Sequence, residues 1–345
     1  MVITEAENFL FALLKSGIYG EDIDFSPFST LKEGLWRQVF DIASRQGVVS
    51  IAGEALSSAP KELLPPKALL LEWIGQIAMQ ENIYSLQRKR VRELRELWGK
   101  AGIKCVELKG ESVGRWYYKP SSRYSCDFDC YLSDYDKGNN IIEHQGITVN
   151  KDFYKNSSFY WKELYVENHQ FCTPVRGKKE MKQLERRLQQ LLADYPEFPN
   201  ADFNALFLME HAWGHFFEHA ISMKHVCDWA VFRRACGSDV DWESYEQVAK
   251  DCGFWKFSQA FSHIADLLDG LISEEQLSDE EQKLLQSILQ TERHGSLNDG
   301  WSTRFNLVKG YYKHRWKYRA FSNHRMMSSL CRSIFAYCFD RHPHI

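Results

Sequence analysis

Residues 103–132 decide the fold, and they read IKCVELKGESVGRWYYKPSSRYSCDFDCYL. The two ends of this stretch, residues 103–108 and 127–132, are short runs typical of β-strands, and the second is rich in aromatic residues. Lys109 and Gly110 end the first run, and residues 111–118 are predicted to form a helix. The predicted order is therefore strand, tight turn, helix and strand, which indicates a core that contains a β-sheet.

The second predicted strand carries two acids, Asp127 and Asp129. Side chains two residues apart on a strand point to the same face, so we expect these carboxylates to project together while Phe128 turns into the core. Two carboxylates placed in this way can share a hard divalent ion such as Mg²⁺. A third carboxylate on a neighbouring strand would complete a two-metal site that activates an attacking hydroxyl and stabilises the leaving oxygen.

The third carboxylate is expected in residues 163–171, ELYVENHQF, which form another predicted strand. Glu167 shares one face of this alternating run with Glu163, Tyr165 and His169, while Leu164 shares the other face with Val166. Glu167 is our predicted ligand. Glu163 is the substitute because the register of the strand is open at this point. Residues 145–149 are a weaker strand candidate.

The turn at Lys109 and Gly110 suggests a site for phosphate. A glycine lets the backbone come close to an anion, and the N-terminus of a following helix favours negative charge. Lys109 and Arg123 would neutralise a triphosphate. Each feature is common at ordinary turns, and only their order and spacing give them weight together.

Helical patterns surround this core. Thr4 is a predicted N-cap, as is Ser29 or Thr30 further along, and Gly47 suits a helix C-terminus. A long helix is expected over residues 69–100, an amphipathic helix is expected over 178–195, and a further helix is expected over 204–235. The sequence thus predicts an α+β protein with an N-terminal helical region (1–100), an α/β core (101–178) and a C-terminal helical region with a basic tail (179–345).

The same motifs resemble those of the nucleotidyltransferase superfamily, which includes DNA polymerase beta and the antibiotic adenylyltransferases. More closely, the chain is similar to an uncharacterised bacterial nucleotidyltransferase-like family with a Leu-Lys-Gly strand end, an Arg before an Asp-x-Asp strand and a later Glu-x-His. These motifs stand here as Leu108-Lys109-Gly110, Arg123 before Asp127-Phe128-Asp129, and Glu167-Asn168-His169. The flanking stretches 35–48, 81–103, 209–216 and 223–230 also resemble the helices of that family.

The resemblance implies a mixed-sheet nucleotidyltransferase fold in a bacterial, cytoplasmic protein. It also implies an Mg²⁺- or Mn²⁺-dependent transfer of NMP from an NTP to an unknown acceptor hydroxyl. Asp127 and Asp129 would hold both metals, with Glu167 as the third ligand. Lys109, Gly110, Ser112 and Arg123 would contact the nucleotide.

The chain departs from the superfamily at Glu111, because the superfamily prefers Gly-Ser or Gly-Gly after the first strand. An acid there would repel an NTP if it pointed inward. A catalytically inactive fold used for binding or regulation is therefore an alternative function.

Three histidines, His211, His215 and His219, recur at helical spacing on one stripe. Histidines at i and i+4 can bind zinc, but the H-E-x-x-H order of metalloproteases is absent. Packing against the core is the alternative that we favour, and His211 or Asp228 is a candidate for lining an acceptor pocket.

The chain has nine cysteines but no C-x-x-C pair, which argues against a zinc ribbon and against a disulfide framework. Cys126 and Cys130, which flank the Asp pair, are expected to pack as small hydrophobic residues. The N-terminus lacks the features of a signal peptide, and no apolar run reaches membrane-spanning length, so a cytoplasmic protein with reduced thiols and no membrane contact is predicted.

The last 45 residues, 301–345, are basic, with nine Lys and Arg against the single acid Asp340. Basic residues mixed with Tyr and Trp between Lys313 and Arg319 are typical of a nucleic-acid surface. The alternative, which we favour because no RNA-binding motif accompanies the patch, is an amphipathic helix that packs on the more acidic remainder.

Overall fold

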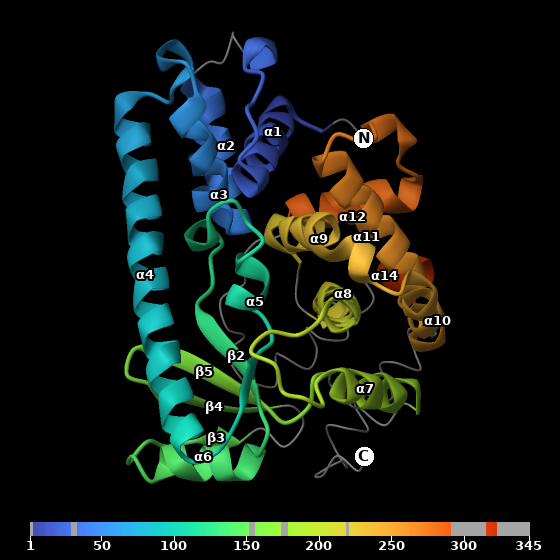
Figure 1. The fold of residues 1–345 in the computed structure, drawn as a ribbon. Helices are drawn as coiled ribbons and strands as arrows, with labels where there is room; N and C mark the ends of the chain where they lie inside the picture. Colours follow the sequence, from blue (N-terminus) through green and yellow to red (C-terminus); the bar gives the residue numbers. More distant parts are fainter. Residues whose placement is uncertain are drawn as a thin grey trace, which may run out of the picture.

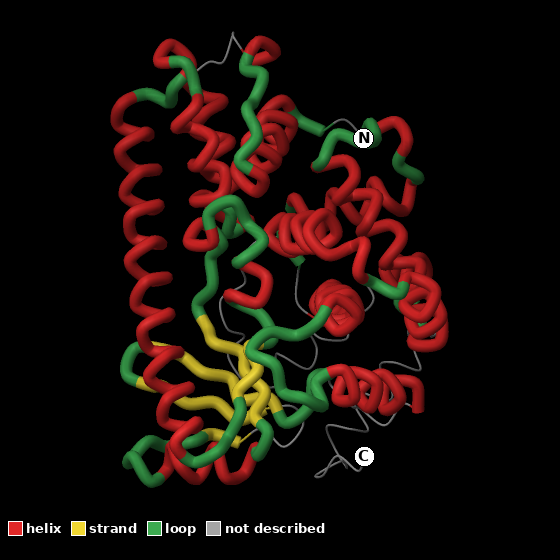
Figure 2. The backbone as a smooth tube through the Cα atoms, viewed as in Figure 1, coloured by secondary structure: helices red, strands yellow, loops and turns green. Residues whose placement is uncertain are grey.

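The computed structural model describes residues 3–28, 33–151, 156–173, 179–218, 221–290 and 315–322. It is an α+β fold, as predicted, in which a mixed sheet of five strands is flanked by helices (Figures 1 and 2). In Figure 1 the sheet lies in the lower half beside the long helix α4, and α5, α8 and α9 lie above it and to the right.

The sheet has the strand order β1-β2-β5-β4-β3. Strand β2 pairs in parallel with β5, and the other pairs are antiparallel. The strands are β1 (Cys105–Glu107), β2 (Asp127–Leu132), β3 (Asn150–Lys151), β4 (Asn156–Trp161) and β5 (Leu164–His169). The prediction of a strand over residues 145–149 is wrong. There the backbone turns out of α6 (Tyr135–Glu143), with the Gln145 and Gly146 N–H groups bonded to carbonyls of the helix end.

One face of the sheet packs on α4 (Lys67–Lys100) and α6. Phe128 is 2% exposed, as the alternation on β2 predicts, and it belongs to a cluster with Leu94 and Trp98 of α4. Cys130 also packs there, whereas Cys126 is exposed, so the predicted burial of Cys126 is wrong. Since side chains alternate along a strand, the other face of β2 carries Asp127 and Asp129.

The N-terminal helices begin and end where the sequence indicates. Thr4 caps α1 (Glu5–Tyr19) in a capping box with Glu7. Gly47, with φ of +69°, follows α2 (Glu33–Gln46), while the predicted caps Ser29 and Thr30 lie outside the described residues. The remaining elements of this half and of the core's connections are α3 (Val49–Glu54), α5 (Glu111–Gly114) and the 3₁₀ turns η1 (Ser26–Phe28), η2 (Ala55–Ser58), η3 (Lys61–Leu63) and η4 (Pro120–Ser122).

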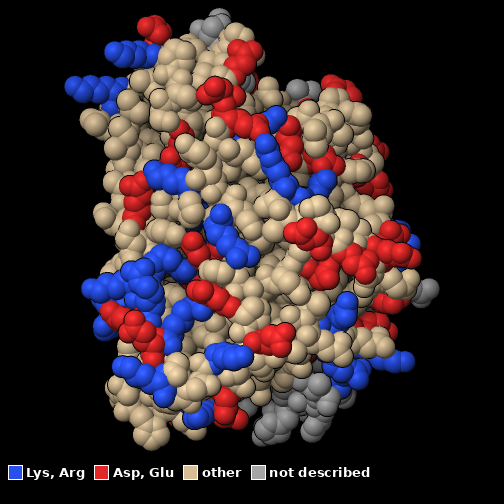
Figure 3. All heavy atoms as spheres, in the orientation of Figure 1, with Lys and Arg blue, Asp and Glu red and all other residues tan. Residues whose placement is uncertain are grey.

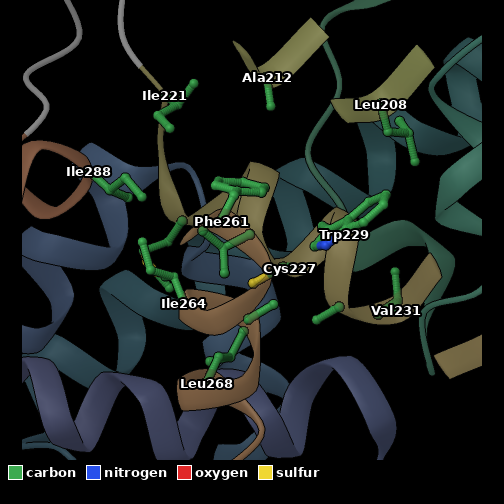
Figure 4. Packing of buried hydrophobic residues seen from close by; sticks show 14 of the residues in the cluster. Leu208, Ala212, Ile221, Cys227, Trp229, Val231, Phe261, Ile264, Leu268 and Ile288 are labelled. Atoms are coloured by element: carbon green, nitrogen blue, oxygen red, sulfur yellow. The ribbon is translucent and has the colours of Figure 1, made fainter. Parts of the chain in front are cut away.

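The C-terminal helices pack around a second, larger cluster that also takes in α1, α2 and α3. Figure 4 shows part of this cluster, where α9 contributes Trp229 and Val231 and α11 contributes Phe261 and Ile264. The predicted helix over 204–235 is two helices, α8 and α9. The described C-terminal elements are α7 (Lys179–Leu191), α8 (Ala201–Glu218), α9 (Met223–Cys236), η5 (Gly237–Asp239), α10 (Trp242–Cys252), α11 (Trp255–Leu268), η6 (Glu274–Gln276), α12 (Asp279–Leu289) and α14 (Arg315–Phe321).

The described part of the basic tail, α14, packs on the body of the protein. Lys317 is 6% exposed, and its Nζ donates to the Phe216 carbonyl oxygen at 2.7 Å, near the end of α8. Trp213 of α8 donates in turn to the Phe321 carbonyl oxygen. One cation of the predicted nucleic-acid patch is therefore buried, while Lys313 lies outside the described residues. Over the face in Figure 3, basic and acidic side chains are interspersed.

Among the helices that the structure describes, none is both long enough and apolar enough to cross a membrane.

Candidate active site

The predicted carboxylates meet at the junction of the two parallel strands. Asp129 of β2 is directly opposite Glu167 of β5, and Asp127 is opposite Tyr165. His169 is two residues beyond Glu167 and so lies on the same face. The register that the sequence left open therefore brings Glu167 beside the Asp pair.

Asp129 is the most heavily bonded group of the site. It is 4% exposed, with the Lys109 ammonium 2.9 Å from Oδ2 and the His169 Nε2 2.8 Å from Oδ1. Burial alone would raise the pKa of Asp129, but the Lys109 charge and the His169 hydrogen bond hold it well below its usual range. Burial likewise opposes the charge of Lys109, whose pKa is nevertheless raised by Asp129 and Asp127. Asp129 is thus ionised and already paired with a cation.

Three side chains could hold a metal ion. The ligand atoms of Asp129, Glu167 and His169 all lie within 4.8 Å of one another. Glu167 is partly exposed, and its Oε2 accepts from Asn156 at 2.8 Å. Asp127 is half-buried on the same face, with Ser125 Oγ 3.4 Å from Oδ1, and is not a member of this close group. Carboxylate oxygens fit Mg²⁺ and Mn²⁺, and an imidazole nitrogen is a ligand that Mn²⁺ also accepts.

Glu163, the substitute candidate, lies outside this group. It precedes the first residue of β5, is exposed, and forms an ion pair with Arg90 of α4, with Oε1 2.7 Å from Nη2. This contact holds its carboxylate on α4. The structure therefore brings Glu167, and not Glu163, to the carboxylate pair.

The predicted phosphate turn is held to α4 by a buried carboxylate. Glu107, 1% exposed, accepts from Arg88 through both oxygens and from the Glu111 N–H at 2.8 Å. Gly110 has φ of +65°, and a Cβ there would lie 2.7 Å from Glu107 Oε1, so both the conformation and the space require glycine.

The side chain of Glu111 turns to α4, where Tyr84 donates to its Oε2 at 2.8 Å. Ser112 is fully buried, and its Oγ has no hydrogen-bond partner among the described residues. Glu111, the acid at which the chain departs from the superfamily, is therefore hydrogen-bonded to Tyr84 of α4.

Arg123 has a partner that its sequence position did not reveal. Its guanidinium forms a two-pronged ion pair with Asp228 of α9, at 2.7 and 2.8 Å, and Tyr117 also donates to Asp228 at 2.7 Å. All three residues are buried. Burial would raise the pKa of Asp228, but the Arg123 charge lowers it, so the pair remains ionised. Asp228 was proposed from the sequence to line the acceptor pocket, and in the structure both of its carboxylate oxygens bind Arg123.

The two histidines of α8 form an aromatic cluster with a third histidine, His225 of α9. The rings of His211 and His215 are 4.2 Å apart, and His225 of α9 lies 6.2 and 5.8 Å from them. Burial lowers the pKa of His225 to about 4. Of the described residues, these histidines are not among the groups whose ligand atoms approach closely enough for a metal, and His219 lies outside the described residues.

Sequence reasoning missed the part played by His169. Its position two residues after Glu167 placed it on the carboxylate face, and this two-residue spacing on the strand was the signal that could have identified it. Lys224, one residue before His225, was not singled out from the sequence, and its Nζ lies 3.5 Å from the Tyr124 carbonyl oxygen.

Comparison with known families agrees with this geometry. A family model described as uncharacterised nucleotidyltransferase matches residues 32–270, which include the whole sheet and every residue of the site. The match covers more than half of the chain, and the protein belongs to this family of uncharacterised nucleotidyltransferases. The comparisons found no match among curated proteins and none among solved structures.

Proposed function

We propose that the protein transfers an NMP group from an NTP to an acceptor hydroxyl, with a divalent metal held by Asp127, Asp129 and Glu167. The observation that carries this proposal is the direct pairing of Asp129 with Glu167 across parallel strands. Family membership supports the general chemistry.

The chain supplies orientation and charge. His169 would hold the Asp129 carboxylate in place through its 2.8 Å hydrogen bond. A bound Mg²⁺ or Mn²⁺ would stabilise charge on the phosphoryl oxygens and lower the pKa of the attacking hydroxyl. Lys109, whose ammonium lies 2.9 Å from Asp129 Oδ2, would pair with a phosphate oxygen when the Asp129 carboxylate is used to hold the metal.

The transfer balances as a displacement at the α-phosphorus. The acceptor oxygen bonds to the α-phosphorus, the bond from that phosphorus to the bridging oxygen breaks, and pyrophosphate leaves. Glu167, the most accessible carboxylate of the close group, would accept the proton of the acceptor hydroxyl. Such phosphoryl transfer depends mainly on positioning and electrostatics, which this constellation provides.

Glu111 does not favour the inactive alternative. Its carboxylate is bonded to Tyr84 on α4, so the repulsion of an NTP by an inward-pointing acid does not apply in this arrangement.

The test is calorimetric binding of each NTP, with and without Mg²⁺ or Mn²⁺, to the wild type and to an Asp127→Ala/Asp129→Ala variant. We expect metal-dependent binding that the double variant loses. Absence of NTP binding by the folded wild-type protein in either metal would overturn the transferase proposal and leave a binding or regulatory fold.

A further inference from the structure

Lys224 is a cation that the chemistry above does not use. It lies in the first turn of α9 and is only partly exposed. Its Nζ lies 3.5 Å from the Tyr124 carbonyl oxygen, a long contact with a neutral acceptor. No carboxylate in the described part of the chain lies within 4.0 Å of this ammonium.

The other cations near the site are directly paired. Lys109 bonds Asp129, and Arg123 is held by both oxygens of Asp228. Burial and the neighbouring Arg123 charge lower the pKa of Lys224, whereas those of Lys109 and Arg123 are raised by their carboxylate partners. A partly buried ammonium without a carboxylate in direct contact is costly, so its position favours an anion that is not part of the chain.

The position of Lys224 shows where this anion would lie. Tyr124 precedes Asp127 by three residues, so the ammonium stands at the entry to β2. The charge of Asp127 raises the pKa of Lys224, so the ammonium lies within electrostatic reach of the carboxylate face of β2. It also lies at the N-terminal end of a 14-residue helix, where the helix dipole favours negative charge.

We propose that Lys224 anchors the polyphosphate chain of the nucleotide, opposite the carboxylates that hold the metal. This inference rests on the proposed function and deepens it. The carboxylates of Asp127, Asp129 and Glu167 repel a triphosphate, so a cation in addition to the metal and Lys109 would offset that repulsion. The proposal also assigns the two basic residues differently: Arg123 positions the segment before β2, and Lys224 contacts the ligand.

The consequence is selectivity for the length of the phosphate chain. An ammonium that pairs with the terminal phosphates contributes to the binding of a nucleoside triphosphate and contributes little to that of a monophosphate. If Lys224 only bonds the Tyr124 carbonyl, its substitution would alter the shape of the site and weaken the binding of all three nucleotides equally.

The experiment measures the affinities of ATP, ADP and AMP in Mn²⁺ for the wild type, Lys224→Gln and Lys224→Arg. The matched control is Lys104→Gln, because Lys104 also bonds one backbone carbonyl, that of Asp194 at 3.1 Å, but lies at the far end of β1. Loss of a charge-assisted pair weakens binding by about 10- to 100-fold, so we expect this loss for ATP in Lys224→Gln and a change below about threefold for AMP. Lys224→Arg should recover most of the ATP affinity, and Lys104→Gln should match the wild type.

Equal losses for ATP and AMP in Lys224→Gln, or wild-type affinity for ATP, would overturn the anchor and leave the transferase proposal intact. Absence of ATP binding by the wild type would overturn both. Circular dichroism spectra and melting temperatures of all variants separate these outcomes from misfolding. If Lys224→Gln does not fold, the affinities of Lys224→Arg for ATP and AMP provide the test. Binding of ATP and AMP that is weakened equally, by about fivefold, would contradict the anchor.

Discussion

Asp129 is the residue on which the contacts of the site converge. One oxygen bonds Lys109 and the other bonds His169, and Glu167 stands opposite on the neighbouring strand. An internal cation therefore occupies a carboxylate oxygen that a metal would use. Under the proposed function, Lys109 would compete with a metal for that oxygen, and a bound nucleotide would give its ammonium another partner.

This competition predicts the effect of Lys109→Met on metal binding. Removing one positive charge beside three carboxylates should tighten Mn²⁺ binding about tenfold without nucleotide, since a near charge contributes on the order of 1–2 kcal/mol in such surroundings. Electron paramagnetic resonance of a Mn²⁺ titration measures it. Lys119→Met, which removes a lysine paired with Glu54 and Glu81, is the control. Weaker Mn²⁺ binding in Lys109→Met would show that the lysine does not compete.

His225 makes stability depend on pH. Its pKa is about 4 in the folded protein, where burial opposes the charge, against an ordinary value of 6.5. The unfolded chain therefore takes up a proton that the folded protein does not. The contribution of neutral His225 is complete above pH 6.5 and is lost as the pH falls toward 4, by up to about 3 kcal/mol.

His225→Gln removes that titration while keeping an acceptor for the Ser222 N–H at the helix start. Urea unfolding at pH 7.5, 6.5, 5.5 and 4.5 should show a smaller loss of stability in the variant than in the wild type over this window. Parallel curves would mean that His225 is not held neutral by the fold.

At the scale of elements, the turn between β1 and α5 is held in place by contacts with α4. Glu107 binds Arg88 and the Glu111 N–H, and the backbone at Gly110 passes close over this carboxylate. The order of the elements was predictable from the sequence, because a Lys-Gly strand end before a helical stretch is a local signal. The bracing was not, since it joins residues of α4 and β1 whose contact depends on the packing of the whole helix.

We predict that Gly110→Ala destabilises the protein by about 2–3 kcal/mol and weakens NTP binding, because it adds a collision with Glu107 to an unfavourable positive φ. Gly102→Ala is the matched control. It has φ of +77° but no atom within 4 Å of the added Cβ, and should cost only about 1 kcal/mol. Thermal unfolding and calorimetry check both variants. Equal costs would show that the turn is not tightly braced.

At the scale of the molecule, the sequence predicted the class of fold and the face of β2 that carries the acids. Strand β2 has the bounds that its pattern predicted, and Phe128 is buried behind the Asp pair. Pairing across the sheet was not available from the sequence. The polar segment at the start of β4 gave no clear strand signal, and the ion pair of Arg123 with Asp228 joins residues 105 positions apart.

The packing of distant segments also decides which charged groups face the site. Asp228 and Lys224 come from the same helix. Asp228 forms an ion pair with Arg123, whereas Lys224 has no carboxylate partner among the described residues. The N-terminal and C-terminal helices share one hydrophobic cluster, which fixes α9 relative to the sheet. Local motifs therefore predicted which carboxylates lie together, but they did not predict the ion pairs that the cations form.

The most direct test of the account compares Glu167→Gln with Glu163→Gln in Mn²⁺-dependent ATP binding. These residues are four positions apart, and only Glu167 belongs to the close group with Asp129, whereas Glu163 binds Arg90. We predict at least about tenfold weaker Mn²⁺-dependent binding in Glu167→Gln, from the loss of one carboxylate ligand, and wild-type binding in Glu163→Gln. Wild-type binding in Glu167→Gln, or equal losses in both, would contradict a metal site at the junction of β2 and β5.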